Sequence, residues 1–333
     1  MKRIGFITFM IWSLLACQSE SNKQEAAVVE TPSVQVPLFQ ADSAYAYVAK
    51  QVAFGPRVPN SKAHRQTGDW IIQQLKAWGW EVQEQPFTAV TYDGVKLKSR
   101  NIIASYQPQV AKRILLGAHW DTRPMADKDV ARVNEAIDGA NDGGSGVGVL
   151  LEIARSIQAS SVKPQVGIDM IFFDAEDWGA PSSSTAPPIN AYGGYCLGSD
   201  YWAKNPHKPG YSAYFGILLD MVGAKGAQFR YDTESMQAAP SVVRRVWDKG
   251  ASLGFGRYFI FEEAGGLIDD HIPVIREAKI PMIDIIDLRK NDKFFFDEHH
   301  THGDSMPVID KSTLQAVGQT VLAILFEETA EVS

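Results

Sequence analysis

Two adjacent carboxylates, Glu176 and Asp177, lie shortly after the apolar run 170–173 in this chain of 333 residues. Such a run is typical of a buried central strand of a parallel sheet, and ligands bind at the carboxyl ends of these strands. Because two free anions in one cleft repel each other, the pair favours a division of labour, in which one carboxylate binds a metal ion and the other transfers protons. Taken alone, a solvated strand exit explains the pair equally well.

Other segments supply more side chains of the kinds that bind zinc. The candidates share an expected position at a strand end or in a loop, and they are His119, Asp121, Asp142, Asp220, His299, His300 and His302. Nitrogen and carboxylate ligands without thiolates suit a catalytic zinc site with an open position, because structural zinc favours cysteine. Asp142 lies in the glycine-rich segment 139–146, where glycine lets the backbone turn sharply and aim one carboxylate.

Simpler explanations exist for several of these residues. Asp142 could cap the helix that follows it, and Asp220 could be an ordinary acid at a strand end. The acids at 269–270, which precede His271 and a proline, could form a helix N-terminus, where negative charge is favoured. The three histidines of segment 297–304 cannot all point one way in an extended loop. We therefore expect at most two of them to bind metal.

The elements that must position these side chains alternate between strands and helices. Period-2 and apolar runs predict strands over 81–91, 94–103, 113–119, 166–173, 213–219 and 280–286. Helical spacing predicts helices over 41–51, 63–78, 240–253, 273–278 and 311–327, one near 194–202, and one that Ser145 caps. The pattern predicts a single α/β domain with a central, mixed, mostly parallel sheet, antiparallel at its start and flanked by helices on both faces.

Composition excludes some functions. The formal net charge is −7, and no cluster of lysine and arginine occurs beyond the N-terminus, so we expect no nucleic-acid partner. Of the two cysteines, Cys196 is expected to be a small core residue rather than a nucleophile. His64 and His207 lie outside any cluster, and both are expected on the surface.

The N-terminus has the composition of an export signal. Lys2 and Arg3 precede the apolar run 4–15, which is too short to span a membrane and leads to Leu-Leu-Ala-Cys at Cys17. This ending resembles a bacterial lipoprotein signal, which implies cleavage before Cys17 and lipidation of its thiol. We expect a signal over 1–17, a flexible tether over 18–37 and a catalytic domain over 38–333, anchored to a membrane and facing the periplasm or the cell exterior.

From about residue 52 to 326, the chain resembles the glutaminyl cyclases, which share the fold of secreted zinc aminopeptidases. The resemblance is carried, in order, by AHWDTRP, GANDGGSGVGVLLEIAR, IFFDAED, LLDMVGA, GGLIDDHIP and HHTHGD. It implies one Zn²⁺ held by Asp142, Asp177 and His300, with Glu176 as general base and acid. It also implies that Asp220 and Asp269 are buried acids near Glu176. The implied substrates are peptides and proteins that begin with glutamine, whose side chain is closed into pyroglutamate with loss of ammonia.

The aminopeptidase relatives use the same scaffold with two zinc ions. Every two-zinc position is filled in this chain, by His119, Asp142, Asp177, Asp220 and His300, so the ligands alone do not separate the two activities. The resemblance favours a cyclase through Asp269, where peptidases more often have serine. A lipoprotein that only binds its ligand, with a decayed site, is a third alternative; no acid of the constellation is missing, which argues against it.

The expected substrate pocket departs from the animal cyclases. His299 stands where those enzymes have tryptophan, and Asp177 stands where many relatives have glutamate. We expect the shorter aspartate to bind zinc as well. Trp178 is a candidate replacement for the missing tryptophan, and with Ile268 and His299 it forms the expected pocket wall.

Overall fold

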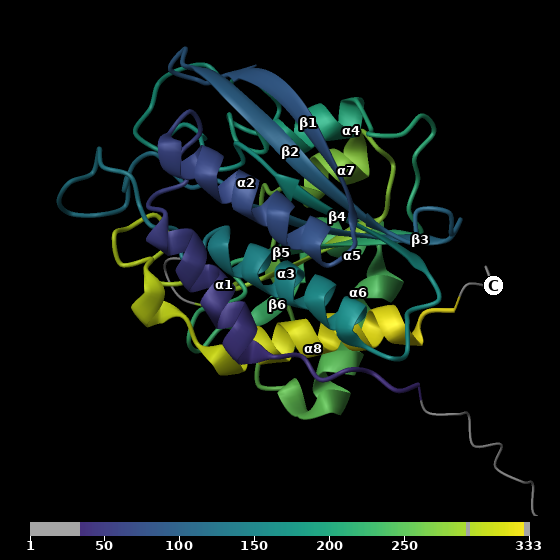
Figure 1. The fold of residues 1–333 in the computed structure, drawn as a ribbon. Helices are drawn as coiled ribbons and strands as arrows, with labels where there is room; N and C mark the ends of the chain where they lie inside the picture. Colours follow the sequence, from purple (N-terminus) through teal and green to yellow (C-terminus); the bar gives the residue numbers. More distant parts are fainter. Residues whose placement is uncertain (1–33, 291–293, 330–333) are drawn as a thin grey trace, which may run out of the picture. The chain divides into compact units, whose positions relative to one another are not determined.

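The computed structural model describes residues 34–290 and 294–329, so the expected signal over 1–17 and residues 18–33 of the expected tether lie outside the described residues. A six-stranded sheet runs through the described part (Figure 1). Its order is β1 (Glu81–Val90), β2 (Lys96–Tyr106), β4 (Gly167–Phe173), β3 (Arg113–His119), β5 (Phe215–Asp220) and β8 (Met282–Ile286). Strands β4, β3, β5 and β8 are parallel, whereas β1 and β2 pair antiparallel. The predicted mixed, mostly parallel sheet is confirmed.

Helices cover both faces of this sheet because the central strands are apolar on both sides. Along β3, Ile114 and Leu116 belong to one hydrophobic cluster and Leu115 belongs to another. The first cluster contains residues of α1 (Ala41–Ala53), α2 (Lys62–Ala77), α3 (Gly144–Ala159), α6 (Pro240–Gly250) and α8 (Lys311–Glu327). The second contains residues of α4 (Leu197–Lys204) and α7 (His271–Arg276). This alternation agrees with the period-2 geometry of strands.

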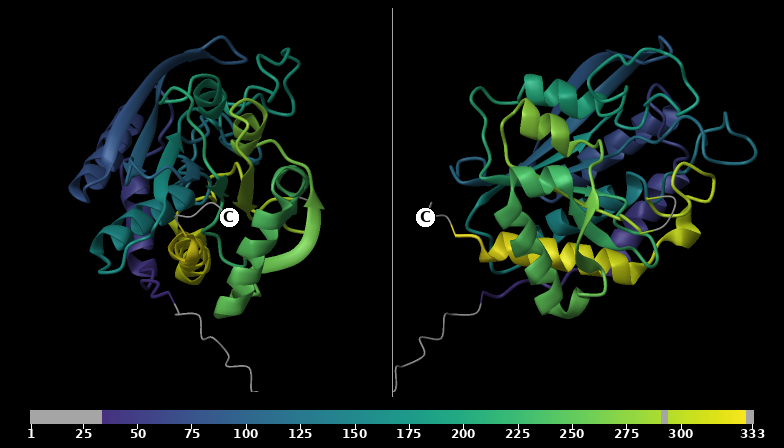
Figure 2. Two further views of the ribbon diagram at one scale, coloured as in Figure 1. Left: turned by 90° about the vertical axis from the view of Figure 1, so that its right-hand side faces the viewer. Right: turned by 180° about the vertical axis from the view of Figure 1, so that it is seen from behind.

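A second, smaller sheet was not predicted from the sequence. It pairs β6 (Phe229–Asp232) with β7 (Phe259–Gly265), and α5 (Thr233–Ala238) follows β6 directly. The yellow-green strand β7 curves beside α6, on the side opposite the blue strands β1 and β2 (Figure 2). Strand β7 is only partly buried, and its short apolar run Phe-Ile-Phe is followed at once by Glu262 and Glu263, so the apolar pattern is too short to predict a strand.

Three local predictions are corrected by the structure. Ser145 does not cap α3: the cap residue is Gly143, with φ of 76°, and the Ser145 hydroxyl donates to the Asn141 carbonyl from inside the first turn. His64 is buried, because it lies on the same inward face of α2 as Ile71. Its ring stacks on Trp120, and its Nε2 lies 2.8 Å from Asp174 Oδ1.

His207 is the third correction, because it is partly buried between Trp202 and Tyr211. Cys196 is fully buried, as predicted for a core residue. Within the described parts of the chain, no helix combines the length and the apolar character needed to cross a bilayer.

Candidate metal and catalytic site

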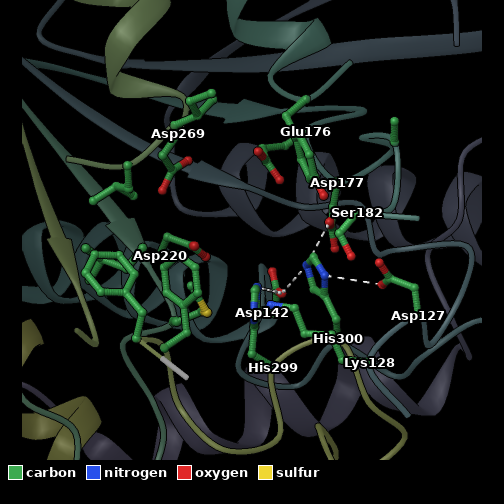
Figure 3. A pocket seen from close by; sticks show the side chains of 18 of the residues that line it. Asp127, Lys128, Asp142, Glu176, Asp177, Ser182, Asp220, Asp269, His299 and His300 are labelled. Carbon is green, nitrogen blue, oxygen red and sulfur yellow. Dashed lines mark hydrogen bonds and ion pairs between the residues drawn. The ribbon is translucent and has the colours of Figure 1, made fainter. Parts of the chain in front are cut away.

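A cavity of about 450 Å³ opens where the loops that follow β3, β4 and β5 meet (Figure 3). Its polar lining consists of acids, histidines, one lysine, one serine and one tyrosine: Asp127, Lys128, Asp142, Glu176, Asp177, Ser182, Tyr195, Asp220, Asp269, His299 and His300. The position agrees with the rule that ligands of α/β sheets bind at the carboxyl ends of strands. The acids that sequence analysis placed at separate strand ends therefore face one space.

Asp142, Asp177 and His300 converge on one side of this cavity. His300 Nε2 lies 3.2 Å from Asp177 Oδ1 and 3.7 Å from Asp142 Oδ2 (Figure 3). Asp177 Oδ2 is buried and has no hydrogen-bond partner among the described residues. A buried carboxylate oxygen without a donor is costly unless a cation or a proton satisfies it. Two carboxylates and one imidazole that leave an open side fit a catalytic zinc ion.

A second group of possible ligands adjoins the first through Asp142. His119 Nε2 lies 3.0 Å from Asp142 Oδ1 and 3.2 Å from Asp220 Oδ1. Asp142 thus turns one oxygen towards His119 and the other towards His300. Burial alone would lower the pKa of His119, but the carboxylates of Asp121, Asp142 and Asp220 around its ring raise this pKa well above its ordinary value. The geometry accordingly offers positions for one or for two divalent ions.

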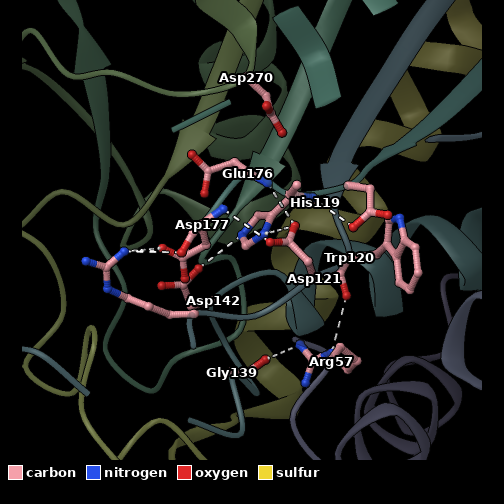
Figure 4. A network of polar contacts seen from close by, with 12 residues as sticks. Arg57, His119, Trp120, Asp121, Gly139, Asp142, Glu176, Asp177 and Asp270 are labelled. Atoms are coloured by element: carbon pink, nitrogen blue, oxygen red, sulfur yellow. Dashed lines mark hydrogen bonds and ion pairs between the residues drawn. The ribbon is translucent and has the colours of Figure 1, made fainter. Parts of the chain in front are cut away.

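The loop that carries Asp142 is held from two sides. Asp304 accepts hydrogen bonds from the backbone N–H groups of Asn141 and Asp142, at 2.7 and 3.0 Å. Arg57 is fully buried and donates to the backbone carbonyl of Gly139 (Figure 4). A Cβ at Gly143 would lie 2.7 Å from His119 Cε1, so only glycine fits this turn. The sequence analysis assigned no role to Arg57, and Asp304, the last residue of the HHTHGD motif, supports the backbone of the Asp142 loop rather than facing the cavity.

The Glu176–Asp177 pair is fixed by a neighbouring loop. The Asp121 carboxylate accepts the backbone N–H groups of Glu176 and Asp177, at 3.0 and 3.2 Å (Figure 4). Ala175, just before the pair, has φ of 56°, a left-handed conformation that turns the chain out of β4. Asp121, which sequence analysis grouped with the possible ligands, instead supports the backbone of the two carboxylates.

Glu176 lies among other acids on the far side of the cavity from His300. Burial, with added repulsion from Asp177 and Asp269, raises the pKa of Glu176 well above its ordinary value. Burial and the nearby Asp269 also raise the pKa of Asp220 to about 7. The nearest thiol, Cys196 Sγ, lies 3.6 Å from Glu176 Oε1. This environment favours carboxyl groups that hold protons near neutral pH.

The acids at 269–270 do not act as helix caps. Asp270 precedes α7 but makes no capping bond through its side chain, which instead accepts from Ser199 Oγ. Asp269 lines the cavity together with Glu176 and Asp220. The explanation of these residues as an ordinary helix N-terminus is thus not supported.

Of the three histidines of the 297–304 segment, His299 and His300 lie ring to ring beside Asp142, with which they form a possible metal-binding group, whereas His302 lies elsewhere. His299 Nδ1 lies 2.6 Å from Lys128 Nζ, and its Nε2 is 3.8 Å from Asp142 Oδ2. Burial lowers the pKa of His299 well below its ordinary value, so the ring is neutral and accepts from Lys128. His302 turns to Asp129, with 2.9 Å between Nδ1 and Oδ2. His300 alone of the three is within 4 Å of both Asp142 and Asp177.

The pocket wall differs from the predicted one at Trp178. Its side chain packs in a hydrophobic cluster with Phe87, Leu97 and Leu197, away from the residues that line the cavity. The prediction of Trp178 as pocket wall is corrected, because its side chain packs against β1, β2 and α4 instead of lining the cavity. Ile268 and His299 do line the cavity. The sequence analysis missed the remaining apolar wall, which is Met221, Leu267, Ile286, Phe294 and Phe295.

Known proteins resemble this chain over most of its length. Residues 101–325 match peptidase family M28. The chain is 50% identical to Porphyromonas gingivalis glutaminyl cyclase, over 86% of this chain and 97% of that one, with a TM-score of 0.81. It is 47% identical to Bacteroides thetaiotaomicron glutaminyl cyclase bound to N-acetylhistamine, and the match covers 89% of this chain and 100% of that one, with a TM-score of 0.85. It is 49% identical to a Zn-dependent exopeptidase from Parabacteroides distasonis, and the match covers 88% of this chain and 100% of that one, also with a TM-score of 0.85.

Proposed function

Since this chain belongs to peptidase family M28 and shares about half of its residues with bacterial glutaminyl cyclases, we propose that it is a zinc-dependent glutaminyl-peptide cyclotransferase. It converts the N-terminal glutamine of peptides and proteins into pyroglutamate and releases ammonia. The observation that carries this proposal is the position of Asp269, which lines the same cavity as Glu176 and Asp220. An acid at this position is the feature by which the sequence resembles cyclases rather than peptidases.

Asp142, Asp177 and His300 are the proposed ligands of one zinc ion. Their support is the convergence of three side chains and the unpartnered Asp177 Oδ2. When bound there, zinc supplies a Lewis acid for the carbonyl oxygen of the glutamine side chain. The apolar wall of the cavity, which includes Leu267 and Phe295, holds the side chain folded and excludes water from it.

Glu176 is the proposed proton carrier. The substrate's α-amine attacks the carbon of its own side-chain carboxamide, so that a new C–N bond closes the ring and the bond to the amide nitrogen breaks. Glu176 accepts a proton from the attacking amine and returns it to the departing nitrogen, which leaves as ammonia. The raised pKa of Glu176, caused by burial and neighbouring acids, suits a group that must both take and give a proton. Asp220 and Asp269 are the proposed buried acids that maintain this environment.

A metallo-aminopeptidase is the second candidate, and the group of His119, Asp142 and Asp220 favours it. With a second ion at this group, Glu176 would activate water for hydrolysis of the first peptide bond. Metal analysis of the purified protein separates the two candidates, because the cyclase should hold about one zinc per chain and the peptidase about two.

The decisive experiment compares two peptides that differ only in the first residue. A peptide that begins with glutamine should release ammonia and lose the mass of ammonia, whereas its leucine-initiated counterpart should stay intact. Free leucine from the second peptide, with no ammonia from the first, would establish the peptidase instead.

The protein is also proposed to be an exported lipoprotein, anchored to a membrane through lipidated Cys17 and facing the periplasm or the cell exterior. The support is the sequence of residues 1–17, with its two cations, short apolar run and Leu-Leu-Ala-Cys ending. This location would bring the site to peptides and proteins outside the cytoplasm.

A further inference from the structure

Arg123 is a fully buried cation beside the proposed zinc ligands, and none of the steps above uses it. Its Nη1 donates to the Asp177 carbonyl at 3.2 Å and to Asp177 Oδ1 at 3.3 Å. Its Nε and Nη2 donate to the two oxygens of Asp127, at 2.6 and 3.0 Å. The guanidinium also lies over the ring of Tyr195, with 5.5 Å between its carbon and the ring centre. The guanidinium therefore contacts three residues that line the cavity, namely Asp127, Asp177 and Tyr195.

Asp127 continues the connection to the other proposed ligand. Its Oδ1 lies 3.4 Å from His300 Nδ1 as an ion-pair contact, and this buried nitrogen makes no hydrogen bond to any described residue, so Asp127 is the acceptor that it faces. The opposite nitrogen, His300 Nε2, faces Asp142 and Asp177. An acceptor at Nδ1 fixes the proton there and leaves the lone pair of Nε2 for a metal ion.

The contacts form a chain from Asp177 through Arg123 and Asp127 to His300. The two ends come from different segments, one after β4 and one within 297–304, so the chain of contacts adds a second link to the direct pair of Asp177 and His300. The loop of Asp127 is also anchored to the histidine segment, since the Lys128 backbone N–H donates to the His300 carbonyl at 3.2 Å. Arginine suits this position better than lysine, because only a planar fork reaches both carboxylates at once.

We propose that Arg123 and Asp127 are positioning residues of the zinc site, which hold Asp177 and His300 at the spacing that binds the metal and fix the ring of His300. This inference rests on the proposed ligand set, but not on which reaction the site performs. Arg123 and Asp127 should therefore affect how tightly zinc binds and should not transfer protons, because neither side chain contacts Glu176 in the described network.

The test is Asp127→Asn, with Asp129→Asn as its matched control. Asp129 lies two residues further along the same loop and contacts His302, which is outside the proposed ligand set. The zinc dissociation constant of each variant is measured by competition with a coloured chelator. Asp127→Asn should bind zinc roughly 10- to 100-fold more weakly than wild type, whereas Asp129→Asn should bind it as tightly as wild type. Arg123→Lys, which keeps the charge but not the fork, should fall between them.

Two further readouts separate positioning from a merely structural role. The zinc-free Asp127→Asn protein should still be folded at the assay temperature by far-UV circular dichroism, although its unfolding midpoint should be lower than that of Asp129→Asn, because the buried Arg123 loses a charged partner. The turnover number of Asp127→Asn at saturating zinc should recover to within a few-fold of wild type, on whichever peptide the wild type accepts. Wild-type zinc affinity in Asp127→Asn would overturn the inference, and so would an equal loss in Asp129→Asn. Neither result bears on the choice between cyclase and peptidase, which the peptide comparison decides separately.

Discussion

At the scale of single residues, the site depends on giving two adjacent carboxylates different environments. Asp177 turns one oxygen towards His300 and Arg123, but burial and repulsion from Asp142 still raise its pKa, and its second oxygen has no donor among the described residues. Glu176 turns towards buried acids and the thiol of Cys196, so its charged form is disfavoured. The left-handed turn at Ala175 takes the chain out of β4 just before the pair, and the two side chains then face different neighbours, His300 for Asp177 and Cys196 for Glu176.

Glu176→Gln should therefore separate metal binding from catalysis. Glutamine keeps the size of the side chain but cannot carry a proton, so turnover should fall by roughly 10³-fold. Zinc content should stay at the wild-type value, because the ligands are unchanged. Turnover and metal analysis on the same preparation test both statements, with the exposed Glu135→Gln as control. Normal turnover in Glu176→Gln would remove this residue from the mechanism.

A second prediction at this scale concerns His207, which accepts a hydrogen bond from Trp202 Nε1 at 3.2 Å. Burial lowers the pKa of His207 from 6.5 to about 4. Above pH 6.5 the ring is neutral in both the folded and the unfolded protein, so protonation of His207 does not lower the free energy of unfolding there. Between 6.5 and about 4, the unfolded chain binds the proton more tightly, and the free energy of unfolding should fall by about 2 kcal/mol after allowance for partial exposure.

Urea unfolding of wild type and His207→Gln checks this sign. Glutamine cannot titrate but can still accept from Trp202. On going from about pH 7 to about pH 4.5, the wild type should lose more stability than the variant. An equal loss in both proteins would show that His207 does not cause the effect.

At the scale of elements, the close approach of α3 to the sheet assembles the site. A Cβ at Gly146 would lie 2.1 Å from the Leu219 carbonyl oxygen and 3.0 Å from Ala118 Cβ. Glycine at this position lets the first turn of α3 rest on β3 and β5. Asp142, just before α3, is thereby brought against His119 and Asp220, which end those strands.

Gly146→Ala should test this packing. The added methyl group must displace backbone, because its nearest neighbour is a carbonyl of β5, and the free energy of unfolding should fall by about 2 kcal/mol or more. The control is Gly256→Ala, at a glycine whose nearest neighbour would be 3.9 Å away, where the change should stay within about 1 kcal/mol. Chemical unfolding of both variants gives the comparison. Equal stability in the two variants would contradict the close packing of α3.

At the scale of the whole molecule, one cavity receives side chains from segments spread over much of the chain. Asp127, Asp142, Glu176, Asp220, Asp269 and His300 all line it. The parallel strands β3, β4 and β5 bring several of these loops to one edge of the sheet. Asp269 comes from the segment before α7 and His300 from the segment before α8, so residues from far apart in the chain must be packed together to form the site.

Membrane attachment is a separate property at this scale. It is predicted to depend on lipidation of Cys17, a residue outside the part of the chain that the structure describes. Wild-type protein expressed in a bacterial host should partition into the detergent phase, because several acyl chains give firm anchoring. Cys17→Ala, which has no thiol to lipidate, should stay in the aqueous phase with an unchanged turnover number. Detergent partitioning of wild type into the aqueous phase would refute the lipid anchor.

The sequence by itself determined most of the fold and the chemical type of the site. Apolar runs and period-2 patterns predicted all six strands of the main sheet, and burial on both faces leaves the clearest pattern in β3, β4, β5 and β8, whereas the four-residue β6 and the partly exposed β7 were not recognised. The sequence also showed that acids and histidines, the residue types that bind zinc, lie at the predicted strand ends. The spacing of His64 from Ile71 could also have shown that His64 is buried.

Only the tertiary structure decided how these side chains face one another. His300 and His299 are adjacent and of the same type, and no local pattern tells which of them reaches Asp142 and Asp177. Trp178 follows the carboxylate pair in sequence yet points into the core. The support from Arg57, Arg123 and Asp304 is also long-range. These contacts join residues distant in the chain, so their geometry depends on packing of the whole domain rather than on local sequence.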